Sequence, residues 1–327
     1  MVMPDAITPL LVIAYRRHDL LANLLEYLPN ERQVYVVVDG PARSEHLKDV
    51  AMSQSVVSRW SSSRPKTSIW LRDHNMGGPD GIPAAIDWAL SEEQSICILE
   101  EDCVPSSLSY RYIDRVLDQL QHRPDLAGGT LNNFVAARRG LAKAQPIISL
   151  FPHCWGWFIS KKSWQAIRPH RNDFGPQGEI SHRNELSQLL KHTFPGDADA
   201  QFHWMQIMQR LIRQEIYHWD YAMTLKMWNR GLKFIAPPIN LCSNIGHGEQ
   251  ALNCKKASKN HYLALPTEPR AIDLLNFTLP NQGSYRYRDF DRADQRTILS
   301  PWPWRLLQIR SILKLFVRRV LRLQKQL

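Results

Sequence analysis

Three consecutive carboxylates, Glu100, Glu101 and Asp102, directly follow an apolar run from Ile96 to Leu99. The run is typical of a buried strand, so the acids stand where that strand ends. Two explanations fit this motif. The acids close the strand as a solvated turn, or they hold a hard divalent cation through one or two carboxylates, with phosphate oxygens and water as the other ligands. The motif alone leaves both open.

The elements that must position these acids follow from an alternating pattern in the first half of the chain. The predicted strands cover residues 8–17, 33–40, 66–73 and 95–102, and the predicted helices cover residues 17–28, 41–60 and 81–92. This alternation predicts an α/β fold with a mostly parallel sheet flanked by helices. Ligands of such sheets bind at the carboxyl ends of the strands. The acidic triplet stands where a nucleotide's pyrophosphate would lie, which favours the cation site.

The charge and the cysteines narrow the class of protein. The 327 residues include 41 Lys and Arg against 31 Asp and Glu. Residues 301–327 hold seven of the basic residues and none of the acidic ones, which leaves 34 against 31 elsewhere. The net charge of +10 is therefore largely a property of the tail, and nucleic acid is not a predicted partner. Five cysteines without a CxxC pair predict reduced thiols in a cytoplasmic protein.

The tail itself is predicted to form a basic amphipathic helix. Basic residues recur at positions 310, 314, 318 and 322, and apolar residues populate the other side. Such a helix can lie on an anionic membrane surface, which predicts a peripheral protein on the inner face of the membrane. It can also pack on the domain or on a protein partner, and the sequence leaves that alternative open.

The segment ILEEDCVPSSLSYRYIDRVL, residues 98–117, resembles the acidic strand-end motif of GT-A-fold glycosyltransferases, and in particular that of N-acetylglucosaminyltransferase I. That family has Glu-Asp-Asp where this chain has Glu100, Glu101 and Asp102. The resemblance covers roughly residues 9–249 and implies a GT-A-like, Rossmann-type fold with Mn²⁺ or Mg²⁺ as cofactor. It also implies that Asp102 is a metal ligand and that Glu100 and Glu101 lie at the nucleotide sugar.

Further nucleotide-sugar contacts are implied by the same resemblance. Arg16 and Asp39 end the first two predicted strands, where the family contacts the base and the ribose. An Asp-Gly pair also suits a plain turn. Asn75, Gly77 and Gly78 belong to a loop similar to the Asn-x-Gly loop of many glycosyltransferases. Its glycines let the backbone approach a ligand, or simply make a tight turn.

In the second half, Trp219 and Asp220 match the Trp-Asp pair that begins a helix in the family. The match implies Asp220 as the general base for the acceptor hydroxyl and Trp219 as an acceptor contact, although Asp at a helix start also serves as a cap. His247 is implied as a second metal or pyrophosphate ligand, with an ordinary loop residue as the alternative. Trp155 and Trp157 suit an acceptor wall, because indole faces stack on sugars, and an aromatic core strand explains them equally well.

These features predict a metal-dependent, inverting glycosyltransferase that moves a sugar from a nucleotide sugar, UDP-linked, to a hydroxyl of a glycan or lipid-linked acceptor. The predicted parts are a nucleotide-sugar-binding half (1–130), an acceptor-binding and catalytic half (131–265), a linker or wrapping arm (266–300) and the membrane-surface helix (301–327). One alternative is a sugar-nucleotide nucleotidyltransferase, although the first strand is followed by AYRRHDLL without the expected glycine. Another is a non-catalytic membrane-binding protein that acts through its tail.

Overall fold

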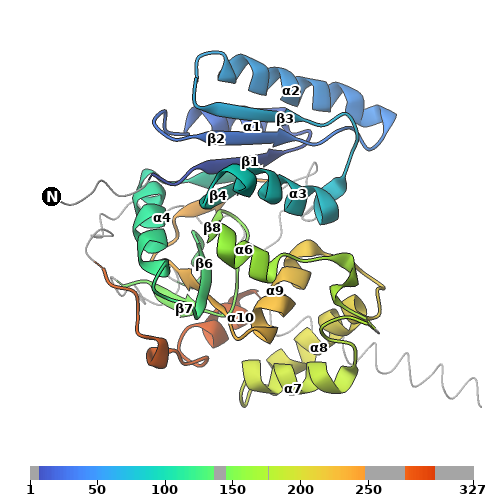
Figure 1. The fold of residues 1–327 in the computed structure, drawn as a ribbon, viewed down its shortest axis with the longest axis vertical. Coiled ribbons are helices and arrows are strands. Elements are labelled where there is room, and N and C mark those ends of the chain that lie inside the picture. Colours follow the sequence, from blue (N-terminus) through green and yellow to red (C-terminus); the bar gives the residue numbers. More distant parts are fainter. Residues whose placement is uncertain (1–6, 136–144, 176, 247–276, 299–327) are drawn as a thin grey trace, which may run out of the picture.

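The computed structural model describes residues 7–135, 145–175, 177–246 and 277–298. Its main sheet is built from eight strands: β1 (Leu10–Ala14), β2 (Val34–Val38), β3 (Thr67–Leu71), β4 (Ser95–Glu100), β6 (Leu126–Thr130), β7 (Ile147–Ser149), β8 (Trp157–Ser160) and β9 (Lys233–Ala236). The strand order is β3-β2-β1-β4-β8-β6-β9-β7. Figure 1 shows this sheet running through the molecule, with helices on both sides.

The sheet is mostly parallel, as predicted. β1 pairs in parallel with β2 and β4, β2 with β3, and β6 with β9. The exceptions are β8, which is antiparallel to both β4 and β6, and β7, which is antiparallel to β9. The four strands predicted in the first half are thus confirmed, and they form one half of the sheet.

Helices cover both faces. The α-helices are α1 (His18–Glu26), α2 (Leu47–Ser61), α3 (Gly77–Glu92), α4 (Ser107–Leu120), α6 (Lys161–Ile167), α7 (Arg183–Thr193), α8 (Ala198–Ile212), α9 (Trp219–Asn229) and α10 (Asp291–Ile298). Short 3₁₀ turns are η1 (Ser44–His46), η2 (Arg171–Asp173) and η3 (Gln282–Ser284). Figure 1 shows α1 and α2 at one end of the molecule and α7 and α8 at the other.

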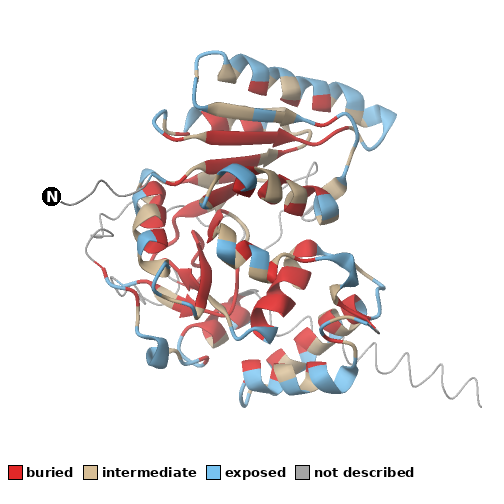
Figure 2. Ribbon diagram, viewed as in Figure 1, coloured by how far each residue is buried: buried red, intermediate tan, exposed pale blue. Residues whose placement is uncertain are grey.

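Alternate strand residues enter two separate cores, because successive side chains of a strand point to opposite faces. Leu11 and Val37 pack in the core that contains α3, α6 and α9. Leu10, Val12 and Val36 pack in the core that contains α1, α2 and α4. Figure 2 shows the central strands buried along their length, which is why these runs are apolar at nearly every position.

The chain leaves the acidic end of β4 through a small second sheet. β5 (Cys103–Pro105) pairs antiparallel with β10 (Cys242–Asn244), and the register sets Cys103 opposite Asn244. This pairing ties residues 242–244 to the acidic triplet. It also fixes the start of α4, because the Ser106 amide and the Ser109 hydroxyl both donate to the Leu241 carbonyl.

The last described residues pack against the rest of the protein. Phe277 and Leu279 are buried in the core with α4, and Tyr287 is buried near α7 and α8. The division of the chain into four parts stays a prediction, and the tail at 301–327 lies outside the described residues. Within the part of the chain that the structure describes, no helix is both long and apolar enough to cross a membrane.

Candidate active site

Three chain segments meet at the carboxyl edge of the parallel strands. The register pairs Ile13 of β1 with Glu100 of β4, and the Glu101 amide donates to the Ile13 carbonyl at 3.0 Å. After β2, the Asp39 amide donates to the Ala14 carbonyl at 3.0 Å. The structure therefore places the acidic triplet, Asp39 and the residues after β1 along one edge.

Glu101 and Asp102 are buried and share one counter-cation, Arg17. Arg17 Nε donates to Glu101 Oε1 at 2.5 Å, and Arg17 Nη2 lies 2.8 Å from Asp102 Oδ2. The other Glu101 oxygen accepts the Tyr15 amide at 2.6 Å. Burial by itself lowers the pKa of Arg17, but the charges of Asp102 and Glu101 outweigh it and raise that pKa above its ordinary value. Arg17 therefore stays charged and fixes both carboxylates.

Glu100 and Asp220 come together from distant parts of the chain. Burial, followed by the negative charges of Asp102 and Glu101, raises the pKa of Glu100 to about 8, and the charge of Asp220 adds to this rise. Asp220 stands in the first turn of α9, and its own pKa is raised by burial. The prediction that the Trp-Asp pair begins a helix is confirmed. Two carboxyl groups that favour the protonated form thus share one neighbourhood.

Residues 244–246 close over Asp102. Asn244 Nδ2 donates to Asp102 Oδ1 at 3.3 Å, and the Ile245 amide donates to the Asp102 carbonyl at 2.9 Å. Arg17 Nη1 donates to the Gly246 carbonyl at 3.5 Å. A Cβ at position 246 would overlap the Asp102 carboxylate and crowd Arg17, so this close approach requires glycine.

Asp39 organises the Asn-x-Gly loop. One carboxylate oxygen accepts from the Met76 amide at 3.1 Å, and the other from the Gly77 amide and Asn75 Nδ2, both at 2.9 Å. Arg72 Nη1 adds a contact at 3.4 Å. The carboxylate thereby satisfies the first amides of α3, which starts at Gly77, four residues before the predicted start at Gly81. In this structure Asp39 and Asn75 bind each other, and their contact with a nucleotide stays a prediction.

The aromatic residues separate into a buried pair and a more open one. Trp157 is 1% exposed and Trp219 is 8% exposed. Their rings stack on each other with centroids 5.9 Å apart. Their ring faces are therefore occupied by protein, as the core-strand alternative describes for Trp157. Trp155 is partly exposed and meets the edge of Phe134, with centroids 5.5 Å apart. Of the three predicted acceptor contacts, Trp155 keeps surface for an acceptor.

The strand-end acids offer the ligand type that Mn²⁺ and Mg²⁺ prefer. Glu101 and Asp102 supply carboxylate oxygens, and a cationic group already lies against both of them. Among the described residues, no group of three or more His, Cys, Asp or Glu side chains is placed to hold a metal ion. One or two carboxylates suffice where phosphate oxygens and water complete the coordination. The acids thus fit a metal that is held together with a diphosphate.

Sequence reasoning missed Arg17, Asn244 and Gly246. The sequence signal for Arg17 is the pair of arginines after the first strand, and the resemblance implies Arg16 of that pair. Arg16 is partly exposed one residue away, and among the described residues Arg17, not Arg16, makes the hydrogen bonds and ion pairs with the acids. Gly78 is exposed in the first turn of α3. His247, the second predicted metal ligand, lies outside the described residues.

Comparisons with known proteins yield weak likenesses. No protein-family model and no curated protein matches this sequence. The mannosyltransferase PcManGT from Pyrobaculum calidifontis, solved in complex with GDP-Man and Mn²⁺, is 12% identical; the match covers 69% of this chain and 73% of that one, with a TM-score of 0.36. Mannose-1-phosphate geranyltransferase from Thermus thermophilus is 12% identical over 71% and 74%, with a TM-score of 0.27. TM-scores this low assign neither an activity nor a donor to the present chain.

Proposed function

We propose that this chain is a glycosyltransferase that moves a sugar from a nucleotide sugar, UDP-linked, to a hydroxyl of a glycan or lipid-linked acceptor. One observation carries the proposal: the ion-paired cluster of Arg17, Glu101 and Asp102 lies at the end of β4, and the neighbouring strand β8 stacks its Trp157 ring on Trp219, next to Asp220. The guanidinium of Arg17, which suits a diphosphate, and the carboxylate of Asp220, which suits proton acceptance, therefore lie in one region of the structure. This is the arrangement that sugar transfer from a diphosphate leaving group requires.

The donor half of the proposed site consists of Arg17, Glu101 and Asp102. The fixed guanidinium of Arg17 suits phosphate oxygens, because its planar fork donates two parallel hydrogen bonds. Glu101 and Asp102 would hold Mn²⁺ or Mg²⁺, which when bound supplies positive charge for the leaving diphosphate. Asp39 accepts the Met76 and Gly77 amides at the start of α3 and so fixes the neighbouring loop, which would contact the nucleotide.

The acceptor half consists of Asp220 and Trp155. Burial raises the pKa of Asp220, so its carboxylate is a stronger proton acceptor than an ordinary Asp side chain. Its place in the first turn of α9 fixes its orientation. Trp155 offers ring surface for a sugar face. A base that activates the acceptor hydroxyl in a single displacement inverts the anomeric configuration.

A nucleotide-sugar panel tests the proposal. Wild-type protein is heated with UDP-, GDP- and dTDP-sugars, with and without Mn²⁺, and the melting temperature is recorded. A ligand at about 100 times its Kd stabilises the fold by about 2.7 kcal/mol, so a true donor gives a clear rise. The rise should be lost in Asp102→Asn, while Asp118→Asn, an exposed carboxylate on α4, serves as the matched control. A wild-type protein that no nucleotide stabilises, with or without metal, is not a nucleotide-sugar transferase.

We also propose that residues 301–327 bind an anionic membrane surface. The support is the spacing of basic residues in the sequence, since this segment lies outside the described residues. A membrane-bound position would bring the site to a lipid-linked acceptor.

A further inference from the structure

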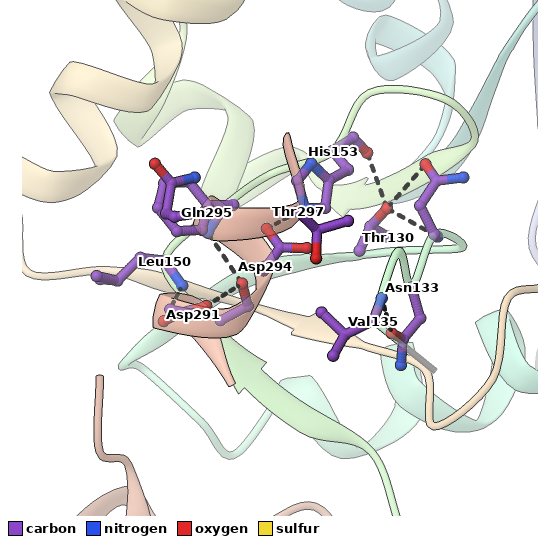
Figure 3. Close-up of polar contacts among 12 residues, drawn as sticks. Thr130, Asn133, Val135, Leu150, His153, Asp291, Asp294, Gln295 and Thr297 are labelled. Atoms are coloured by element: carbon purple, nitrogen blue, oxygen red, sulfur yellow. Dashed lines mark hydrogen bonds and ion pairs between the residues drawn. The ribbon is translucent and has the colours of Figure 1, made fainter. Parts of the chain in front are cut away.

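Helix α10, the last element among the described residues, is held to the rest of the protein by buried carboxylates, which Figure 3 shows. Asp291 is fully buried, and its oxygens accept from the Ser149 hydroxyl at 2.7 Å, the Leu150 amide at 3.0 Å and the Tyr285 hydroxyl at 2.7 Å. Ser149 ends β7 and Leu150 follows it, shortly before residues 153–155. Helix α10 therefore contacts the chain just before residues 153–155.

A second carboxylate of α10 contacts the segment itself. Asp294 is fully buried, and its Oδ2 lies 2.9 Å from His153 Nε2. Its other oxygen, Oδ1, is buried and has no hydrogen-bond partner among the described residues. A buried carboxylate that is half satisfied is costly to keep. Its contact with His153 therefore has to offset that cost, and packing of α10 alone gives no reason for an acid here.

The imidazole of His153 is fixed on its other sides as well. The Phe134 ring lies 4.6 Å from it edge-on, and the Phe151 ring stacks at 6.2 Å, both measured between centroids. The His153 carbonyl accepts the Thr130 hydroxyl at 2.8 Å, at the end of β6. Figure 3 shows His153 between Thr130 and α10. His153 thus links α10 to the edge of the sheet that carries the site.

The segment that His153 begins reaches the two acids of the candidate site. Burial, and then the charges of Asp220 and Glu100, raise the pKa of Cys154 well above its ordinary value. The strand pairing places the segment there as well: β8, which begins at Trp157, pairs with β4, which ends at Glu100, and the Trp157 ring stacks on Trp219, next to Asp220. Trp155, the partly exposed indole, follows in the chain. The position of residues 153–155 relative to Glu100 and Asp220 thus depends on how His153 is held.

We propose that Asp294, acting through His153, is a positioning residue for the acceptor side of the site: its charge holds residues 153–155 beside Glu100 and Asp220. The acceptor role of this segment rests on the proposed function, whereas the coupling itself does not. Asp294 contacts neither Glu100 nor Asp220, so its effect passes through the imidazole of His153.

Asp294→Asn tests the coupling, because it keeps the shape and removes the charge. The first readout is alkylation of Cys154 by iodoacetamide, followed by mass spectrometry of its peptide. If the Cys154 thiol moves away from the buried acids, its thiolate fraction and its exposure to the reagent both increase. We therefore expect alkylation at least about tenfold faster than in wild type. The second readout is rescue by a conservative variant: Asp294→Glu keeps the charge, and its Cys154 should react at close to the wild-type rate. If Asp294 contributed packing alone, the isosteric Asp294→Asn would react like wild type and the longer Asp294→Glu would react faster.

Asp197→Asn is the matched control. Asp197 also anchors the C-terminal segment, through Arg292 at 3.3 Å and Tyr287 at 3.1 Å, but it does not contact His153. Asn preserves its cap on the Ala200 amide. This variant should leave Cys154 alkylation within about twofold of wild type. If Asp294→Asn does not fold, His153→Phe, which keeps a ring but offers no donor to Asp294, should give the same faster alkylation.

The outcomes separate the two proposals. Unchanged alkylation in Asp294→Asn, or an equal increase in Asp197→Asn, overturns the coupling. UDP titration by calorimetry reports on the donor half, and both variants should bind UDP as wild type does. Faster alkylation in a protein whose wild type binds no nucleotide would keep the coupling and overturn the proposed function.

Discussion

The guanidinium of Arg17 lies 2.8 Å from the carboxylate of Asp102 and 2.5 Å from that of Glu101, so the strand-end acids carry their own counter-cation. Tyr15, Ile245 and Gly246 add backbone contacts around this cluster. A divalent cation that binds the same carboxylates must compete with a positive charge that is already in place. Metal and guanidinium are therefore thermodynamically coupled at this site.

The first prediction concerns that competition. Arg17→Gln should raise the affinity of the nucleotide-free protein for Mn²⁺ at least about tenfold, because like charges at short range repel by several kcal/mol at an effective dielectric constant of about 20. Electron paramagnetic resonance of free Mn²⁺ measures the affinity. Arg16→Gln removes the same charge one residue away and should change it by less than about threefold. Equal affinities in wild type and Arg17→Gln would show that the metal does not bind at these acids.

The second prediction concerns Asp102. Asp102→Asn should abolish the Mn²⁺ dependence of UDP binding, since the amide oxygen still accepts from Asn244 Nδ2 but the charge that a divalent cation requires is lost. Calorimetric titration with and without Mn²⁺ measures this, and circular dichroism checks the fold. A variant that binds UDP with undiminished Mn²⁺ dependence would place the metal elsewhere.

The third prediction concerns Asp220. Asp220→Asn should lower the transfer rate by about 10²–10⁴-fold, the usual contribution of a general base. UDP affinity should be unchanged, because a base acts mainly in the transition state. The melting temperature should not fall, since burial already disfavours the charged form of Asp220. Near-normal transfer by this variant would mean that another group, such as Glu100, accepts the proton.

The fourth prediction is a pH dependence of stability. Burial raises the pKa of Asp291 to about 7, although hydrogen bonds from Tyr285, Ser149 and Leu150 oppose the rise. The unfolded Asp has a pKa of about 3.9. The folded protein therefore holds a proton that the unfolded chain has lost between these values, so stability falls as pH rises from about 4 to about 7. Asp291→Asn removes this loss.

Urea unfolding of wild type and Asp291→Asn, at about pH 5 and about pH 8, measures the difference. The urea midpoint of Asp291→Asn, relative to that of wild type, should increase as the pH rises. Asp289→Asn, just outside α10 and not buried, is the control and should show a constant gap. A gap for Asp291→Asn that is also constant across this range would contradict the raised pKa.

The fifth prediction concerns the tail. Deletion of residues 301–327 should release the protein from vesicles that contain phosphatidylserine and preserve turnover on a soluble acceptor. Full-length protein should also dissociate as salt is raised, because screening weakens the attraction of the seven basic residues. Vesicle sedimentation measures both. Salt-insensitive binding by the truncated chain would exclude the tail as the membrane contact.

Local patterns were sufficient to predict the first half of the fold. The β-branched run of β2 is buried at every position, and such a run specifies a central strand without knowledge of its neighbours. The start of α3 was placed too late because the residue that caps it, Asp39, lies on another segment of the chain. The order of strands in the second half, with β8 inserted between β4 and β6, could not be predicted, since it depends on pairings between distant residues.

The site was predictable only in part for the same reason. The acidic triplet and the helix start at Asp220 are visible as local motifs. The role of Arg17 depends on carboxylates 84 or more residues away, and nothing in its own segment distinguishes it from Arg16. Trp157 and Trp219 could not be assigned from their types, because indole rings serve equally in a core and in a sugar-binding wall. Only their packing on each other places them in the core.

The close packing of Gly246 against Asp102 restricts how these two positions can change in evolution, and related sequences can test this restriction. The two positions are 144 residues apart, yet a methyl group at one would occupy the space of the carboxylate at the other. Relatives of this chain are therefore expected to change these positions as a pair. A relative with a larger residue in place of Gly246 should also have a smaller or uncharged residue in place of Asp102. That residue would no longer pair with the charge of Arg17.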